Sequence, residues 1–357
     1  MDQLLIALMA VFAALGAADR IFGNRFGLGQ EFENGIQTMG SLALAMVGIV
    51  CLAPVLATVL RPVIAPVFQL VGADPAMFAG SILACDMGGG PLARELTTDP
   101  QAAALGGVIT GSMLGATIVF TIPVGMGILD EADRPAMAKG ILCGIVTVPV
   151  GILVGGLAAG FPAGMVARNL IPIVILAGLI ALGLWKAEDA MVRGFTVFGK
   201  AVVVLVTVGL AAAIVQALTG FVVIPGMADI SEGFQTVGTI AIVLAGAFPL
   251  VALINRLLRK PLETVGRWLG INGAAAAGLI ASLANSIATF GMVKDMNPRG
   301  KVVNIAFAVS AAFVFGDHLG FAAGFAPEIL PAMILGKLAG GISAVAVAML
   351  LTKKDNT

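Results

Sequence analysis

The sequence predicts an all-α polytopic membrane protein, an inverted-repeat transporter with about nine transmembrane helices and two re-entrant helical hairpins. Three observations support this class: the apolar composition, an interrupted apolar segment in each of two related halves, and the distribution of basic residues. Of the 357 residues, 59% are hydrophobic and 11% are charged, with a mean hydropathy of +1.06. A soluble domain carries about 25% charged residues. The 20 basic and 20 acidic residues balance, so we expect no nucleic-acid partner.

Eleven apolar segments are candidates for membrane helices. We expect one transporter domain over 1–357, with internal repeats at about 33–129 and 231–326, connecting helices at about 134–218 and a final helix at 328–351. The segments run over 4–18, 36–60, 75–92, 102–129, 136–159, 170–185, 195–218, 236–258, 274–293, 302–325 and 329–351.

The internal repeat follows from an offset of 198 residues. The stretch Gly35 to Gly40 is similar to Gly233 to Gly238, and without a gap from 35 to 100 the offset gives 16 identities in 66 pairs. At this offset Asp86 corresponds to Ala284, next to the polar pair Asn285 and Ser286. Interrupted apolar segments at corresponding positions of two halves are typical of transporter binding sites.

The basic residues favour re-entrant hairpins at 75–96 and 274–294. With nine spans left, sixteen Lys and Arg fall on one face, and the other keeps only Arg61, Arg94 and Arg168. Eleven alternating spans would divide the basic residues almost evenly, so both topologies stay open. The positive-inside rule then predicts a cytoplasmic C-terminus, and the odd number of crossings between the repeats makes them inverted.

Asp86 is the first candidate for a site residue, because an ionised carboxylate inside a membrane is costly and is usually functional. Gly88, Gly89 and Gly90 follow it and predict a hairpin break, since glycine disfavours a continuing helix. We expect a half-helix that ends at Met87 and directs its C-terminal carbonyls, with Asp86, toward a cation. The alternative for Asp86 is a structural ion pair with Arg94 or Lys337.

Further polar groups interrupt apolar segments. Asp317 and His318, between Gly316 and Gly320, predict a broken helix that lines a cavity. A role in substrate binding or gating and a buried Asp317 to Lys337 bridge are both open, and His318, the only histidine, is a candidate proton-sensitive group. Candidates for a substrate or gate contact, or for simple hydrogen bonding and packing, are Gln37, Gln235, Phe78 and Phe290.

Several strings together resemble the ethanolamine-utilisation membrane protein family, EutH. The most specific are Cys85-Asp86-Met87-Gly88-Gly89 and Gly316-Asp317-His318-Leu319-Gly320-Phe321. The resemblance implies a permease of the bacterial inner membrane that brings ethanolamine into the cell. This chain looks shorter around Gly160 and Ala228, so a related small amine is also open as substrate. The other strings lie at 32–36, 79–84, 111–113, 120–123, 306–313 and 336–338.

For a protonated amino alcohol, we expect Asp86 to bind the ammonium and Asn285 and Ser286 to bind the hydroxyl. The alternative function is a cation- or proton-coupled symporter of another small polar solute. An enzyme is not expected, because the common hydrolase and nucleotide-binding motifs are absent from the sequence. The three cysteines have no metal-ligand spacing, so we expect no metal or cofactor. The expected partners are the amine, the lipid bilayer and a second copy in a homodimer.

Overall fold

The computed structural model describes residues 2–352, and at 2, 3, 5, 255, 258–263, 265 and 267 it describes the backbone alone. Helices are the only regular secondary structure in this part of the chain. Seven helical stretches in it are long and apolar enough to cross a membrane, so the chain is a multi-pass membrane protein. They are α2 (Leu28–Leu70), Pro100–Ile128, Glu131–Ala158, α9 (Ala163–Lys186), α10 (Glu188–Thr219), Ile230–Ile254 of α11 and Pro327–Leu351.

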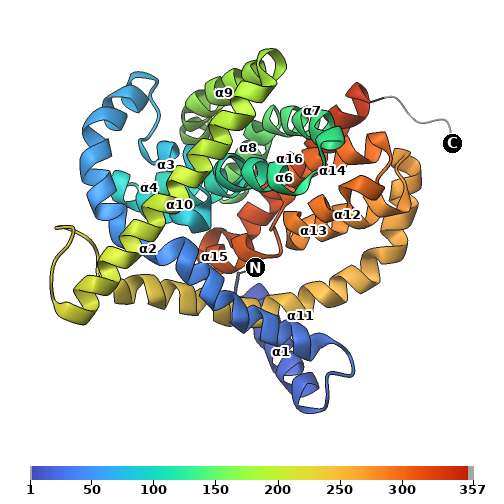
Figure 1. Cartoon of the computed structure of the whole chain (residues 1–357), viewed down its shortest axis with the longest axis horizontal. Coiled ribbons are helices and arrows are strands. Elements are labelled where there is room, and N and C mark those ends of the chain that lie inside the picture. Colours follow the sequence, from blue (N-terminus) through green and yellow to red (C-terminus); the bar gives the residue numbers. More distant parts are fainter. Residues whose placement is uncertain (1, 353–357) are drawn as a thin grey trace.

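Two long helices frame the molecule. α2 has 43 residues and α11 (Ile230–Leu269) has 40, and the two contact each other. In Figure 1, α2 follows the left side and α11 the lower right, with α3 and α4 inside the bend of α2 and α12 and α13 inside α11. The close contact needs a glycine, because a Cβ on Gly35 would lie 2.5 Å from the backbone nitrogen of Ala245.

Each apolar segment that we expected to form a hairpin is divided into short helices. The first gives α3 (Ala76–Ile82), the π-helical turn η1 (Cys85–Gly89) and α4 (Gly90–Leu96), and the second gives α12 (Gly273–Ala284) and α13 (Ser286–Met292). The two arms of each hairpin contact each other. At about 1.5 Å per residue, no arm reaches across a ~30 Å hydrocarbon layer.

The two hairpins begin and end alike at the offset of 198 residues. Gly72 and Gly270 precede them and both have φ of 71°. After them, α5 (Pro100–Ala103) and α14 (Pro298–Ala311) both begin at a proline, the first capped by the side chain of Asp99 and the second by that of Asn297. A proline in the first turn costs no helical hydrogen bond, which explains its place there.

The helices after each hairpin pack on it. α5 continues through η2 (Ala104–Gly115), η3 (Thr117–Thr121) and α6 (Ile122–Ile128), and η2 is buried throughout and contacts α3, α4 and η1. α14 contacts α12, then the chain breaks over 312–316 before α15 (Asp317–Phe325). The remaining described α-helices are α1 (Asp2–Ile21), α7 (Arg134–Ile145), α8 (Val148–Ala158) and α16 (Leu330–Leu351).

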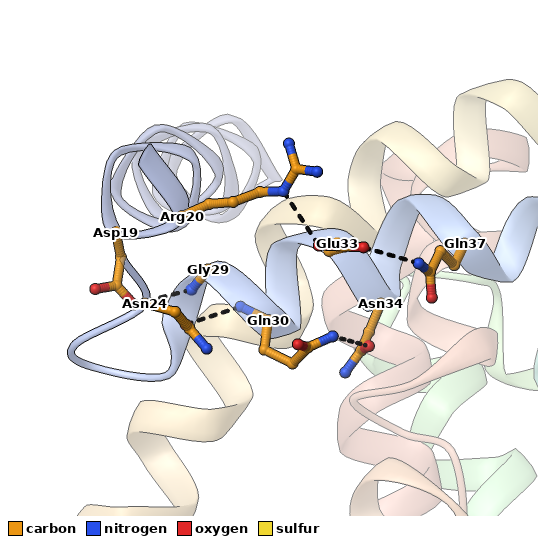
Figure 2. A network of polar contacts seen from close by, with 8 residues as sticks. All are labelled: Asp19, Arg20, Asn24, Gly29, Gln30, Glu33, Asn34 and Gln37. Atoms are coloured by element: carbon orange, nitrogen blue, oxygen red, sulfur yellow. Dashed lines mark hydrogen bonds and ion pairs between the residues drawn. The ribbon is translucent and has the colours of Figure 1, made fainter. Parts of the chain in front are cut away.

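Polar contacts fix the connection from α1 to α2 (Figure 2). The Asp19 carboxylate accepts hydrogen bonds from the backbone N–H groups of Phe26, Leu28 and Gly29 at 2.8 to 3.0 Å. Glu33, on the first turns of α2, pairs with Arg20 of α1 at 3.1 Å. The start of α2 is therefore held on α1.

Gly80 tests whether backbone contact between α3 and η2 is essential. A Cβ at Gly80 would lie 1.8 Å from the carbonyl oxygen of Gly106, so we expect Gly80→Ala to lower the free energy of unfolding by about 1–3 kcal/mol, as overpacking does. A Cβ at Gly178, in α9, meets no atom within 4 Å, which makes Gly178→Ala the matched control. Thermal unfolding in detergent measures both, and equal melting temperatures would contradict the prediction.

Candidate functional site

The tip of the first hairpin carries Asp86, but the helix before it is shorter than expected. α3 ends at Ile82, and Leu83 and Ala84 are extended, so Asp86 follows the break. The expectation of a half-helix ending at Met87 is wrong, because a glycine-lined surface of η2 meets the backbone here. A Cβ on Gly115 would lie 1.9 Å from the carbonyl oxygen of Leu83. At this close distance from η2, the backbone of Leu83 and Ala84 is extended and not helical.

Of the three glycines after Asp86, only Gly88 adopts a backbone conformation that excludes other residues. Its φ is 100°, and a Cβ there would lie 2.3 Å from a side-chain carbon of Ile49. Gly89 is in the right-handed helical region, and Gly90 begins α4 with Pro91 in the first turn. The chain therefore reverses at Gly88, and Gly90 opens the return arm.

The second hairpin holds the segment that leads to Asp317 and His318. The backbone N–H groups of Phe313 and Phe315 donate to the carbonyl oxygens of Ser282 (3.0 Å) and Leu283 (2.8 Å) at the end of α12. Phe313 has φ of 61°, a left-handed conformation that a bulky side chain adopts only when its surroundings impose it. The expectation of a broken helix at Asp317 is confirmed, because α14 ends at Ala311 and α15 begins at Asp317.

A chain of buried polar groups connects the first hairpin to α15 and α16. His318 Nε2 lies 3.8 Å from Asp86 Oδ1, and His318 Nδ1 lies 3.0 Å from Lys337 Nζ. Lys337, which is 0% exposed, also donates to the carbonyl oxygen of Ser112 at 2.5 Å. The side chains of Asp86, His318 and Lys337 thus form a polar cluster inside an apolar protein.

A cavity of about 180 Å³ lies beside this cluster. Asp86, Asp317 and His318 face it together with the rings of Phe120 and Phe313, whose centroids are 5.4 Å apart. Two carboxylates and two aromatic rings favour a cation, because both attract positive charge. The remaining lining comes from α2 and the ends of helices: Ser41, Leu42, Ala45, Ala84, Met87 and Ala116.

Cys85, Asp86 and His318 also bring possible donor atoms to within 4.8 Å of one another. Metal ions use such donors. The Lys337 amine lies 3.0 Å from the same imidazole, however, and its positive charge repels a second cation at this ring. The donor set therefore fits a metal poorly, and we assign none.

The structure brings together three of the five principal candidates, since Asp86, Asp317 and His318 share the cavity. Lys337 contacts His318, and none of the ion pairs between described side chains joins it to Asp317. Asn285 and Ser286 are not part of the cavity lining. Asn285 caps α13 by accepting from the backbone N–H of Ile287 at 2.7 Å, and Ser286 Oγ is buried without a hydrogen-bond partner.

The other candidates also lie outside this cavity. Gln37 is exposed and donates to Glu33 at 3.0 Å (Figure 2), and Gln235 is exposed on α11. Phe78 packs edge-on against Phe68, and Phe290 is buried. Arg94, considered as a partner of Asp86, instead lies 3.4 Å over the ring of Phe325.

Sequence reasoning missed Ser112, Phe120 and Phe313. Ser112 contributes a backbone carbonyl, which no side-chain pattern reveals. Phe120 and Phe313 lie in apolar runs where a phenylalanine gives no functional signal by itself, although both belong to strings that carry the family resemblance.

Comparison with known proteins decides the family. Residues 1–351 match the family model described as "Ethanolamine utilisation protein, EutH". The chain belongs to the EutH family. It is 55% identical to a protein of Listeria monocytogenes named "Probable ethanolamine permease EutH", over 99% of this chain and 95% of the relative. A Salmonella typhimurium protein of the same name is 46% identical over 99% of this chain and 96% of the relative. The "Uncharacterized protein YxeR" of Bacillus subtilis is 52% identical over 98% and 95%. No solved structure matches the chain.

Ser286 provides a test of what the second hairpin tip does. Its Oγ is buried and unpaired, so Ser286→Ala is expected to leave the free energy of unfolding unchanged or raise it by up to about 1 kcal/mol. The control is Ser282→Ala, which removes the 2.9 Å hydrogen bond to Thr289 and should cost about 1 kcal/mol. Chemical denaturation measures both variants. A clear loss of stability in Ser286→Ala would mean that its hydroxyl has a partner after all.

Proposed function

We propose that this EutH-family protein transports ethanolamine, as the protonated amine, across the bacterial plasma membrane. The observation that carries the proposal is the cavity faced by both Asp86 and Asp317. Relatives over essentially the whole chain are named as probable ethanolamine permeases. A permease needs no catalytic group, and the site consists of groups that bind.

The cavity chemistry fits a small amino alcohol. Its volume of about 180 Å³ is several times the ~30 Å³ that one molecule of liquid water occupies, enough for a solute with four heavy atoms. The ammonium brings three N–H donors, which Asp86 and Asp317 accept, while Phe120 and Phe313 line the cavity beside them. His318 Nε2 is the polar atom in the lining best placed for the hydroxyl, in the role first expected of Asn285 and Ser286.

The proposed mechanism moves this site between the two faces through inverted repeats at 33–129 and 231–326. Nine crossings follow when α1 and the pair α14 and α15 are added to the seven long stretches, with the two short hairpins entering from opposite sides. The equal φ of Gly72 and Gly270 and the matched starts of α5 and α14 support the repeat. Both hairpins also reach the region of the cavity, the first directly and the second through Phe313.

We propose that the C-terminus and the face rich in Lys and Arg are cytoplasmic, following the positive-inside rule. Two of the sixteen basic residues behind this proposal, Lys353 and Lys354, lie outside the described residues, as does the C-terminus itself. The arginines expected on the opposite face include Arg94, which is exposed at the base of the first hairpin.

The first functional prediction concerns Asp86. Asp86→Asn keeps the shape of the side chain but removes the charge that binds the ammonium, so we expect uptake of labelled ethanolamine into proteoliposomes to fall at least about tenfold, the equivalent of ~1.4 kcal/mol of binding. Asp317→Asn should act in the same direction.

The control for both is Asp229→Asn. Asp229 is exposed in the connection before α11 and accepts from the backbone N–H of Ser231 at 2.8 Å, a role that asparagine fills equally well. Wild-type uptake in Asp86→Asn would show that the carboxylate is structural. Absence of uptake in the wild type would reject ethanolamine as substrate.

The topology has its own test. Arg168→Cys should react with a membrane-impermeant thiol reagent added outside intact cells, whereas Arg134→Cys should react only after the membrane is opened. Both positions are exposed, and the three native cysteines are buried, so the background is low. Labelling of both from the same side, or of Arg134→Cys from outside and Arg168→Cys only after the membrane is opened, would disprove the nine-span arrangement with a cytoplasmic C-terminus.

A further inference from the structure

We propose that Lys337 is a positioning residue that holds His318 in its neutral form with the proton on Nε2. In this form His318 donates a hydrogen bond into the cavity and does not carry protons across the membrane. The inference deepens the proposed function, on which its meaning for transport rests, but the protonation state itself can be measured independently.

The contact with the charged Lys337 amine determines which ring nitrogen of His318 carries the proton. A charged lysine amine has three donors and no acceptor, so any atom that it hydrogen-bonds must present a lone pair. Lys337 Nζ lies 3.0 Å from His318 Nδ1, which must therefore be the unprotonated ring nitrogen. In a neutral imidazole the single proton is then on Nε2, the nitrogen that faces Asp86 at 3.8 Å.

Lys337 has two acceptors that suit a charged amine. A second acceptor, the carbonyl oxygen of Ser112, lies 2.5 Å from Nζ, and the Asp86 carboxylate lies on the other side of the same imidazole, 3.8 Å from Nε2. A buried charge with good acceptors and opposite charges nearby is the kind that proteins retain.

The groups that face His318 come from every element around α15. Asp317 is its neighbour, η1 contributes Cys85 and Asp86, and α16 contributes Lys337. α11 approaches α15 at Gly320 with apolar side chains only, those of Ile240 and Leu244. η6 (Pro327–Ile329) adds Glu328 beyond the far end of α15. The only cation in contact with the imidazole is thus Lys337, among the described side chains.

The charge of the cluster explains why a neutral histidine is useful. With both aspartates ionised and Lys337 charged, a neutral His318 leaves one net negative charge at the cavity. One protonated amine neutralises it. A protonated His318 would supply that positive charge itself and compete with the substrate, and both the burial of the ring and the charge of Lys337 oppose this.

The direct test uses the fact that the chain has a single histidine. With ¹⁵N-labelled histidine in lipid-reconstituted protein, NMR reports the two ring nitrogens of His318 alone. We expect one protonated and one bare nitrogen, assigned to Nε2 and Nδ1, with no titration between about pH 5 and 8, the range in which a free histidine titrates. A proton on Nδ1, or a ring that titrates in this range, overturns the inference without any variant.

Lys337→Met tests the cause, because it keeps the length and removes the charge. The preference for the Nε2 proton should then weaken, because nothing donates to Nδ1 any longer, and both ring nitrogens should give partly protonated signals. Lys139→Met is the matched control, since Lys139 also donates to a backbone carbonyl, that of Leu351, but at the surface. Unchanged His318 signals in folded Lys337→Met would overturn the role of the lysine.

Uptake distinguishes a hydrogen-bond donor from a proton carrier. His318→Gln retains an N–H donor near the position of Nε2 and cannot titrate, so uptake should stay within about threefold of wild type, whereas His318→Leu should lose about tenfold, the value of roughly one hydrogen bond. Loss of uptake in both variants would overturn the donor role. If the wild type does not transport ethanolamine while NMR shows the Nε2 proton, the proposed function fails and the assignment of Lys337 stands.

Discussion

The constraint on which the rest of the structure depends is the cost of placing charge inside an apolar membrane protein. Lys337 is fully buried and finds partners in His318 and the carbonyl oxygen of Ser112, while Asp86 and Asp317 face the cavity. A continuous helix has few free polar backbone groups to offer. The breaks in the first hairpin and between α14 and α15 place the charged side chains beside the cavity without running a helix through it.

Glycine makes these breaks possible by letting backbone meet backbone. η2 approaches the extended residues after α3 because Gly115 has no side chain, and α12 approaches the second break because Gly316 has none: a Cβ there would lie 2.1 Å from the carbonyl oxygen of Ala284. The 47 glycines of the chain are therefore not simply a consequence of membrane composition. At these positions they set which backbone groups can bond across helices.

The sequence was informative where the chemistry is unusual for a membrane. An acid, a lone histidine and a lysine inside apolar segments identified Asp86, His318 and Lys337, and the offset of 198 residues located both hairpins.

The sequence did not show which side chain Lys337 contacts. A lysine at a similar depth to Asp317 can equally contact the next residue, His318, and only the rotation of α15 and α16 about their axes decides between the two. The end of α3 was missed for a similar reason: the helix stops where η2 presses on it, which is tertiary packing. Asn285 looked like a ligand but caps a helix, a role with the same sequence signal.

The hydrogen bonds from Phe313 and Phe315 to the end of α12 link the position of the second hairpin to that of Asp317. Any displacement of the second hairpin pulls on the segment that carries Asp317 and His318, while Asp86 belongs to the first hairpin. The separation of the two carboxylates is then a function of the conformation, and with it the affinity for a cation. In the proposed mechanism, a solute that draws the carboxylates together would contribute its own binding energy to selecting one conformation.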